Sequence, residues 1–118
     1  SIAIGNPADG FHVLNTIRDS GGAGDSATDE EILDAIGLLA RTEGIFTEPA
    51  GGTTLAVTIK MIKSGVIPKD ESTVICITGN GYKTTDIMVD RVDDCVQLGR
   101  GFGDFENFME AQRAGASR

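Results

Sequence analysis

Several residue types are scarce in this chain of 118 residues, and each scarcity excludes a class of protein. Two cysteines and one histidine are too few for a disulfide framework or a four-ligand zinc site. No apolar run approaches the roughly 20 residues that cross a bilayer, and no basic and apolar signal segment is present. Basic residues number 10 against 18 acidic ones and do not cluster. The sequence therefore predicts no metal site, no membrane span and no nucleic-acid surface.

Aromatic residues are also few, at 5%, so a core must be built mainly from aliphatic side chains. The remaining composition, 40% hydrophobic and 24% charged, is that of a globular protein. Its length suits one small domain, so residues 1–118 are expected to form a single domain or a fragment of one. Cys76 lies in an apolar run, which predicts a buried, reduced thiol and a cytoplasmic location.

Three helices are predicted from the periodicity of apolar residues and from capping signals, over residues 8–19, 28–43 and 49–63. Thr28 and Glu31 have the spacing of a capping box, in which each side chain binds the backbone N–H of the other residue. The buried face of the second helix is expected to contain Ile32, Ile36 and Leu39, and the third helix is expected to carry a stripe of Leu55, Ile59 and Ile62.

Strands are predicted at residues 1–4, 72–78 and 95–98, with the β-branched run at 72–78 typical of a strand covered on both faces. Alternating strands and helices predict the α/β class, as a partial three-layer α/β/α domain with a mostly parallel sheet. Phe102, Phe105, Phe108 and Met109 recur at helical spacing, which predicts a terminal helix that packs back on the domain.

One stretch that could carry chemistry begins at the end of the predicted strand 72–78. There Thr78 is followed by Gly79, Asn80 and Gly81. Ligands of open parallel sheets bind beyond the carboxyl ends of the strands, and glycines let a ligand approach the backbone. The structural alternative is an ordinary turn from a strand into a loop.

Two further stretches have a functional and a structural interpretation. Glu48 and Pro49 open a predicted helix that continues with Gly51 and Gly52, so its free N–H groups could bind an anion. The alternative is simple capping with tight helix packing through the two glycines. Asn6 lies in a Gly-Asn-Pro turn, where an amide side chain commonly bonds its own backbone and could also face a substrate.

Taken in order, four stretches resemble the C-terminal part of the threonine synthase family, which belongs to the tryptophan-synthase-β-like, fold type II, pyridoxal-phosphate enzymes. They are Ser-Ile-Ala-Ile-Gly-Asn-Pro-Ala-Asp-Gly at 1–10, Ser-Ala-Thr-Asp-Glu-Glu-Ile at 26–32, Glu-Gly-Ile-Phe-Thr-Glu-Pro-Ala-Gly-Gly at 43–52 and Ile-Thr-Gly-Asn-Gly-Tyr-Lys at 77–83. The resemblance covers nearly the whole chain and weakens after Asp86.

This resemblance implies a lyase that converts O-phosphohomoserine and water to threonine and phosphate with pyridoxal phosphate as its cofactor. It implies that the Thr78 hydroxyl lies beside the pyridine nitrogen of the cofactor, and that Asn6 faces the substrate side. It also implies that Gly79, Asn80 and Gly81 line the ring and that Glu48 lies near its face.

The lysine that carries the cofactor in this family lies in a sequence context that none of the four lysines of this chain has. These are Lys60, Lys63, Lys69 and Lys83. No catalytic residue is therefore assigned, and the chain is expected to be inactive alone, with the rest of a parent enzyme as its partner. Its uncovered edges and apolar faces predict self-association into a homo-oligomer.

Two other interpretations remain open on the sequence. The chain could be an independent, non-catalytic module that binds a small ligand or a partner subunit. It could also be a piece of a related threonine dehydratase or racemase, since each motif taken singly is shared with such enzymes.

Overall fold

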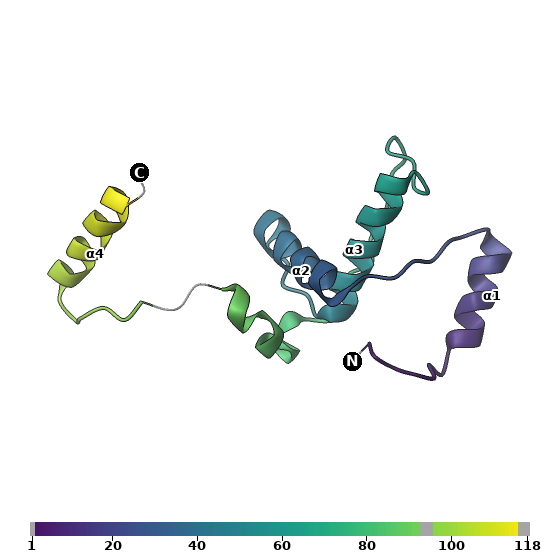
Figure 1. The fold of residues 1–118 in the computed structure, drawn as a ribbon, viewed down its shortest axis with the longest axis horizontal. Coiled ribbons are helices and arrows are strands. Elements are labelled where there is room, and N and C mark those ends of the chain that lie inside the picture. The colour runs from purple at the N-terminus through teal and green to yellow at the C-terminus, as the bar shows by residue number, and fades with distance from the viewer. Residues whose placement is uncertain (1, 93–95, 116–118) are drawn as a thin grey trace.

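The computed structural model describes residues 2–92 and 96–115, and within these ranges it is helical, with no β-strand. The elements are α1 (Gly10–Ser20), α2 (Asp29–Glu43), α3 (Pro49–Ser64), the 3₁₀-helices η1 (Gly81–Lys83) and η2 (Thr85–Arg91), and α4 (Phe102–Gly115). Helices α2 and α3 pack together at the centre, whereas α1 and α4 lie at opposite ends (Figure 1). The radius of gyration is 20.0 Å, compared with about 13 Å for a compact domain of similar length.

Helix α2 begins at the predicted capping box, which is confirmed. The N–H of Glu31 donates to Thr28 Oγ1 over 3.2 Å, and the N–H of Thr28 donates to Glu31 Oε2 over 2.8 Å. The helix ends at Gly44, whose φ of 68° is favourable for glycine. Ile32, Ile36 and Leu39 are buried as predicted, together with Ala35.

Helix α3 also has its predicted bounds to within one residue, with Pro49 in its first turn and Gly65 as its C-cap. Its buried residues are small ones, Gly51, Gly52 and Ala56, whereas the predicted stripe is half-buried. A methyl group at Gly52 would lie 2.7 Å from Cγ1 of Ile36 and 2.9 Å from the carbonyl oxygen of Ile32. The tight packing through glycine, one of the two interpretations of this stretch, is therefore present at Gly52.

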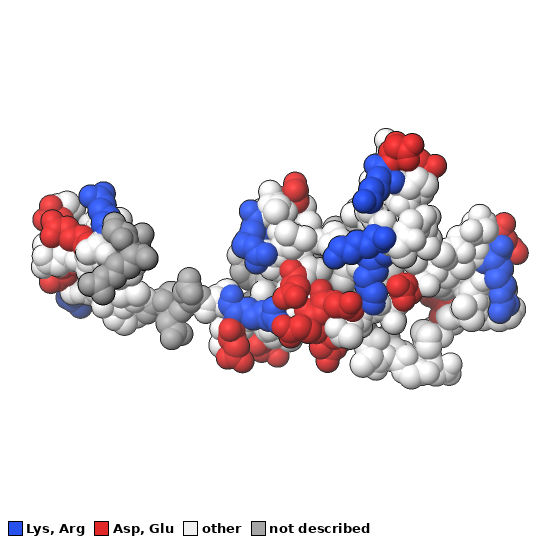
Figure 2. Space-filling model, turned by 45° about the horizontal axis from the view of Figure 1, so that its top comes forward, with Lys and Arg blue, Asp and Glu red and all other residues white. Residues whose placement is uncertain are grey.

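Segment η2 is attached to α2 by an arginine that contacts two carboxylates. Arg91 Nη1 lies 2.6 Å from Asp34 Oδ1, and Arg91 Nη2 pairs with Glu30. These hydrogen bonds, first that to Asp34 and then that to Glu30, raise the pKa of the Arg91 guanidinium. Acidic and basic side chains accordingly lie side by side over the middle of the molecule (Figure 2).

The predicted parallel sheet is not formed by the described residues. Residues 72–78 run from the C-terminal end of α3 back toward its N-terminal end without forming a strand. Residues 2–4 and 96–98 form no strand either, and Ser1 and Cys95 lie outside the described residues. A β-branched run needs neighbouring strands for its backbone hydrogen bonds, and the described chain provides none beside it.

The absence of a covering layer also corrects the prediction for Cys76, which is exposed rather than buried. The predicted docking of the terminal helix is wrong for the same reason. None of the described residues of α4 is buried, and Phe102 is 73% exposed. Helix α1 begins at Gly10, two residues later than predicted, and its apolar side chains Phe11 and Leu14 are exposed as well. No helix among the described residues is long and apolar enough to cross a membrane.

Candidate functional site

Two of the four sequence motifs meet where the chain returns to the N-terminal end of α3. The N–H of Gly81 donates to the carbonyl oxygen of Phe46 over 3.0 Å. The hydroxyl of Thr47 donates to the carbonyl oxygen of Gly79 over 3.3 Å. We call residues 46–48 and 79–83 together the junction. It joins parts of the chain on either side of α3 that are more than 30 residues apart in sequence.

Thr47 is the most buried polar residue of the junction, with 1% of its surface exposed. Its side chain lies over Gly51, where a methyl group would overlap Thr47 Oγ1. Burying a hydroxyl is unfavourable unless it forms a hydrogen bond, and the bond to Gly79 supplies one. Because Gly51 has no side chain, the Thr47 hydroxyl has space to bond with Gly79 of the returning chain.

Glu48 is the N-cap residue of α3, but its side chain makes no capping hydrogen bond. The carboxylate lies instead against Gly79, where an added methyl group would overlap it. Glu48 Oε2 lies 3.7 Å from Nζ of Lys83, and the Glu48 side chain is only 18% exposed. The junction therefore holds a largely covered carboxylate whose partner is a lysine from η1.

The turn after Thr78 depends on glycine at two positions. Gly79 has a φ of 79°, which favours glycine. A methyl group at Gly81 would lie 2.7 Å from the Phe46 ring, which also packs edge to face on Tyr82 with ring centroids 5.5 Å apart. Asn80 Oδ1 accepts the N–H of Tyr82 over 2.9 Å. Asn80 therefore uses one of its side-chain atoms within its own turn.

Thr78 and Asn6, the two other predicted site residues, lie outside the junction. Thr78 precedes it directly, is exposed, and its hydroxyl forms no hydrogen bond with any residue that the structure describes. The sheet edge at which Thr78 was expected is not formed. Asn6 lies on an exposed bend before α1, and no hydrogen bond or ion pair between described residues connects it to the junction.

Sequence reasoning assigned no role to Thr47 or Lys83. Thr47 stands directly before the Glu-Pro pair at the helix start, and the partner of its buried hydroxyl is Gly79, 32 positions later in the sequence. Lys83 was considered only as a lysine that could carry the cofactor. Its contact with Glu48 joins residues 35 positions apart, and no local pattern indicates such a pair.

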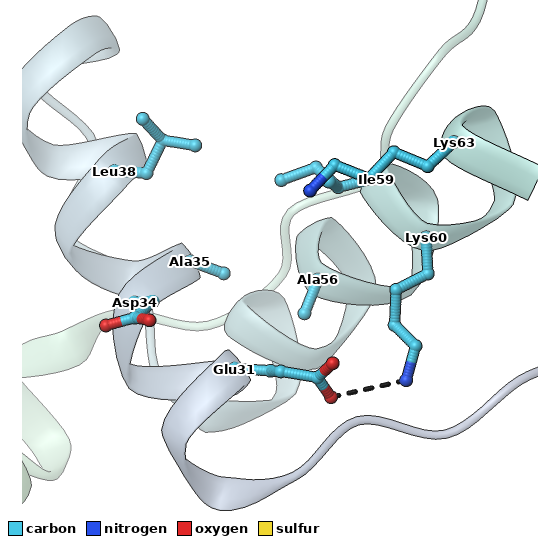
Figure 3. A pocket seen from close by; sticks show the side chains of 8 residues that line it. All are labelled: Glu31, Asp34, Ala35, Leu38, Ala56, Ile59, Lys60 and Lys63. Carbon is cyan, nitrogen blue, oxygen red and sulfur yellow. Dashed lines mark hydrogen bonds and ion pairs between the residues drawn. The ribbon is translucent and has the colours of Figure 1, made fainter.

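A hollow of about 200 Å³ lies between α2 and α3, away from the junction. Ala35 and Ala56 lie on its two walls, and Lys60 extends toward Glu31, with Nζ 3.3 Å from Oε2 (Figure 3). The hydrogen bond from the N–H of Thr28, and then that from Lys60, lowers the pKa of the Glu31 carboxyl. Both charged groups are thus already paired. Over the part of the chain that the structure describes, no three metal-ligating side chains gather.

Comparison with protein families identifies the class of protein. Residues 1–79 match the family described as pyridoxal-phosphate dependent enzymes. Because this match extends over more than half of the chain, the chain belongs to this family. The cofactor of the family is the one that the resemblance implied. Membership also supports the predicted α/β class, although the described residues form helices only.

Individual relatives narrow the resemblance to threonine synthases, as predicted. The chain is 46% identical over 89 residues to the threonine synthase of Bacillus sp. (strain ULM1), covering 75% of the chain and 25% of that protein. It is 40% identical over 98 residues to that of Methanocaldococcus jannaschii, covering 83% and 24%. For Methanosarcina acetivorans the identity is 44% over 90 residues, covering 76% and 22%. The chain thus spans about a quarter of the length of these relatives.

Proposed function

We propose that this chain is a C-terminal portion of a threonine synthase and contributes the side of the cofactor site that faces the pyridine nitrogen. The observation that carries the proposal is its similarity to threonine synthases of three organisms, at 40 to 46% identity over at least three quarters of the chain. The parent enzyme would convert O-phosphohomoserine and water to threonine and phosphate.

The residues around the junction fit pyridoxal phosphate in their chemistry. The Thr78 hydroxyl is exposed and has no hydrogen-bond partner among the described residues, so it is free to bind a ligand. Gly79 and Gly81, which follow it, carry no side chains that would keep a flat ring from the backbone. The ammonium group of Lys83 balances the negative charge of the Glu48 carboxylate, with which it pairs.

Each residue then has a role that follows from its chemistry. Bound pyridoxal phosphate would supply an electron sink for the carbon atoms of the substrate. Thr78 would hold the pyridine nitrogen through a neutral hydroxyl, which does not fix a proton there as a carboxylate would. Gly79, Asn80 and Gly81 would line the ring, Glu48 would lie near its face, and Asn6 would face the substrate.

The predicted sheet belongs to the same proposal. In the parent enzyme, residues 72–78 would form a strand once neighbouring strands offer hydrogen bonds to its backbone. That strand would place Thr78 at a carboxyl edge, where ligands of parallel sheets bind. The lysine that carries the cofactor would come from another part of the parent enzyme.

The experiment is an assay of phosphate release from O-phosphohomoserine by the full-length protein that contains this sequence. We expect Thr78→Val to lower kcat/KM by about 10- to 100-fold and to shift the absorption of the bound cofactor, with Thr78→Ser close to wild type. The 118-residue chain alone should release no phosphate. Turnover by that chain, or threonine deamination in place of phosphate release by the full-length protein, would contradict the proposal.

A further inference from the structure

The orientation of the Glu48 side chain calls for an explanation, because it leaves a favourable interaction unused. A carboxylate at a helix N-terminus is stabilised by the free N–H groups of the first turn and by the helix dipole. Glu48 makes no capping hydrogen bond, although it occupies the N-cap of α3. Its carboxylate is turned instead toward the returning chain, where it meets Gly79 and Lys83. Some other contact must therefore hold it there.

Two glycines with the same φ show how closely Glu48 contacts the turn. Gly65 and Gly79 both have a φ of 79°. At Gly65 a methyl group would have no atom of the described chain within 4 Å beyond its neighbours, whereas at Gly79 it would overlap the Glu48 carboxylate. Gly79 is therefore required for two reasons: its positive φ favours glycine, and the Glu48 carboxylate leaves no room for a side chain.

We propose that Lys83 is a positioning residue, whose ammonium group holds the Glu48 carboxylate on Gly79 and thereby fixes the turn that follows Thr78. Lys83 ends η1, whose first residue, Gly81, is bonded through its N–H to Phe46. The ion pair therefore adds a side-chain contact to the two hydrogen bonds, Gly81 to Phe46 and Thr47 to Gly79, that hold the turn to the start of α3. The relevance of this turn to the cofactor rests on the proposed function, whereas the contact itself does not.

The test is amide hydrogen exchange of Gly81, measured by NMR on the 118-residue chain. Lys83 is 67% exposed, so Lys83→Met should leave the helices folded, and the Ile36 amide within α2 serves as the reference. We expect Lys83→Met to speed exchange at Gly81 about two- to fivefold, with Lys83→Arg close to wild type. Lys69→Met, which removes an exposed lysine beyond the junction, should change neither amide.

A Gly81 amide that exchanges at the wild-type rate in Lys83→Met would overturn the proposal. So would an equal response to Lys69→Met. In a Glu48→Gln background the effect of Lys83→Met should vanish, and a persistent effect would show that Lys83 acts through another group. If Gly81 responds as expected but the full-length protein shows no absorption from bound pyridoxal phosphate, the role of Lys83 stands and the proposed function fails.

Discussion

At the scale of single residues, the contact between the two central helices depends on the absence of a side chain at Gly52. The atoms that an added methyl group would meet belong to Ile32 and Ile36 of α2, and one of them is a backbone carbonyl oxygen. A backbone atom cannot move aside as the end of a side chain can. Gly52 therefore sets how closely α3 approaches α2.

We expect Gly52→Ala to lower the free energy of unfolding by about 1 to 3 kcal/mol, because the added methyl group would overpack this contact. The matched control is Gly37→Ala on α2, where the described atom that the methyl group would meet beyond the backbone of its own helix is Arg41 Nη1, at 3.0 Å. That side chain can move, so the control should be neutral or more stable by up to about 1 kcal/mol. Urea unfolding followed by circular dichroism measures both, and equal midpoints would contradict the expectation.

Residue-level predictions from the sequence succeeded where the signal was local. The capping box of Thr28 and Glu31 joins residues three positions apart. Tight packing through glycine at the start of the third helix was one of two interpretations of that stretch, and the contact partners of Gly52 on α2 could not be named from its neighbours in sequence. The environments of Cys76 and Lys83 could not be predicted in this way. Burial of Cys76 depends on a layer formed by other segments, and the partner of Lys83 precedes α3 in the sequence, whereas Lys83 follows it.

At the scale of elements, the same distinction separates the helices from the strands. The bounds of α2 and α3 were predicted to within a residue or two, since a helix forms its hydrogen bonds within itself and its ends are marked by caps. The run at 72–78 has strong β propensity, but a strand is completed only by another strand. Likewise, the spacing of the apolar residues predicted the helix α4 correctly, but it could not show whether another part of the chain packs against that helix.

The start of α2 should lose stability in acid because of Glu31. The folded state lowers the pKa of this carboxyl, so its contribution is present above the ordinary glutamate pKa and is lost as pH falls through the lower, folded value. We therefore expect the thermal unfolding temperature to decrease as the pH is lowered below about 4.3. This decrease should be steeper for wild type than for Glu31→Gln. Parallel pH profiles of the two proteins, measured by circular dichroism, would show that Glu31 contributes nothing.

At the scale of the whole molecule, the described chain is elongated, extending 65 Å along its longest axis. Apolar side chains lie in the open on both outer helices, with Phe11 of α1 71% exposed and Phe102 of α4 73% exposed. Apolar surface of this extent favours association with other protein surfaces.

We expect the purified chain to form oligomers whose size increases with concentration, because association removes these side chains from water. Sedimentation velocity over a range of concentrations measures this. The double variant Phe11→Ser and Phe102→Ser should shift the distribution toward monomer, with Lys69→Met as a control at an exposed, charged position. A wild-type chain that stays monomeric at high concentration would rule out the predicted self-association.

The return of the chain along α3 has a geometric consequence. Sixteen helical residues at a rise of 1.5 Å make a rod of about 24 Å, whereas residues 65–78 can reach about 46 Å when fully extended. Residues 65–78 are therefore longer than the distance that they must cover. The seven residues 72–78, drawn out straight, would cover about 23 Å, nearly the length of the helix. The irregular course seen here and a straight strand beside α3 can thus end at the same point, next to Thr47, without any shift of the helix.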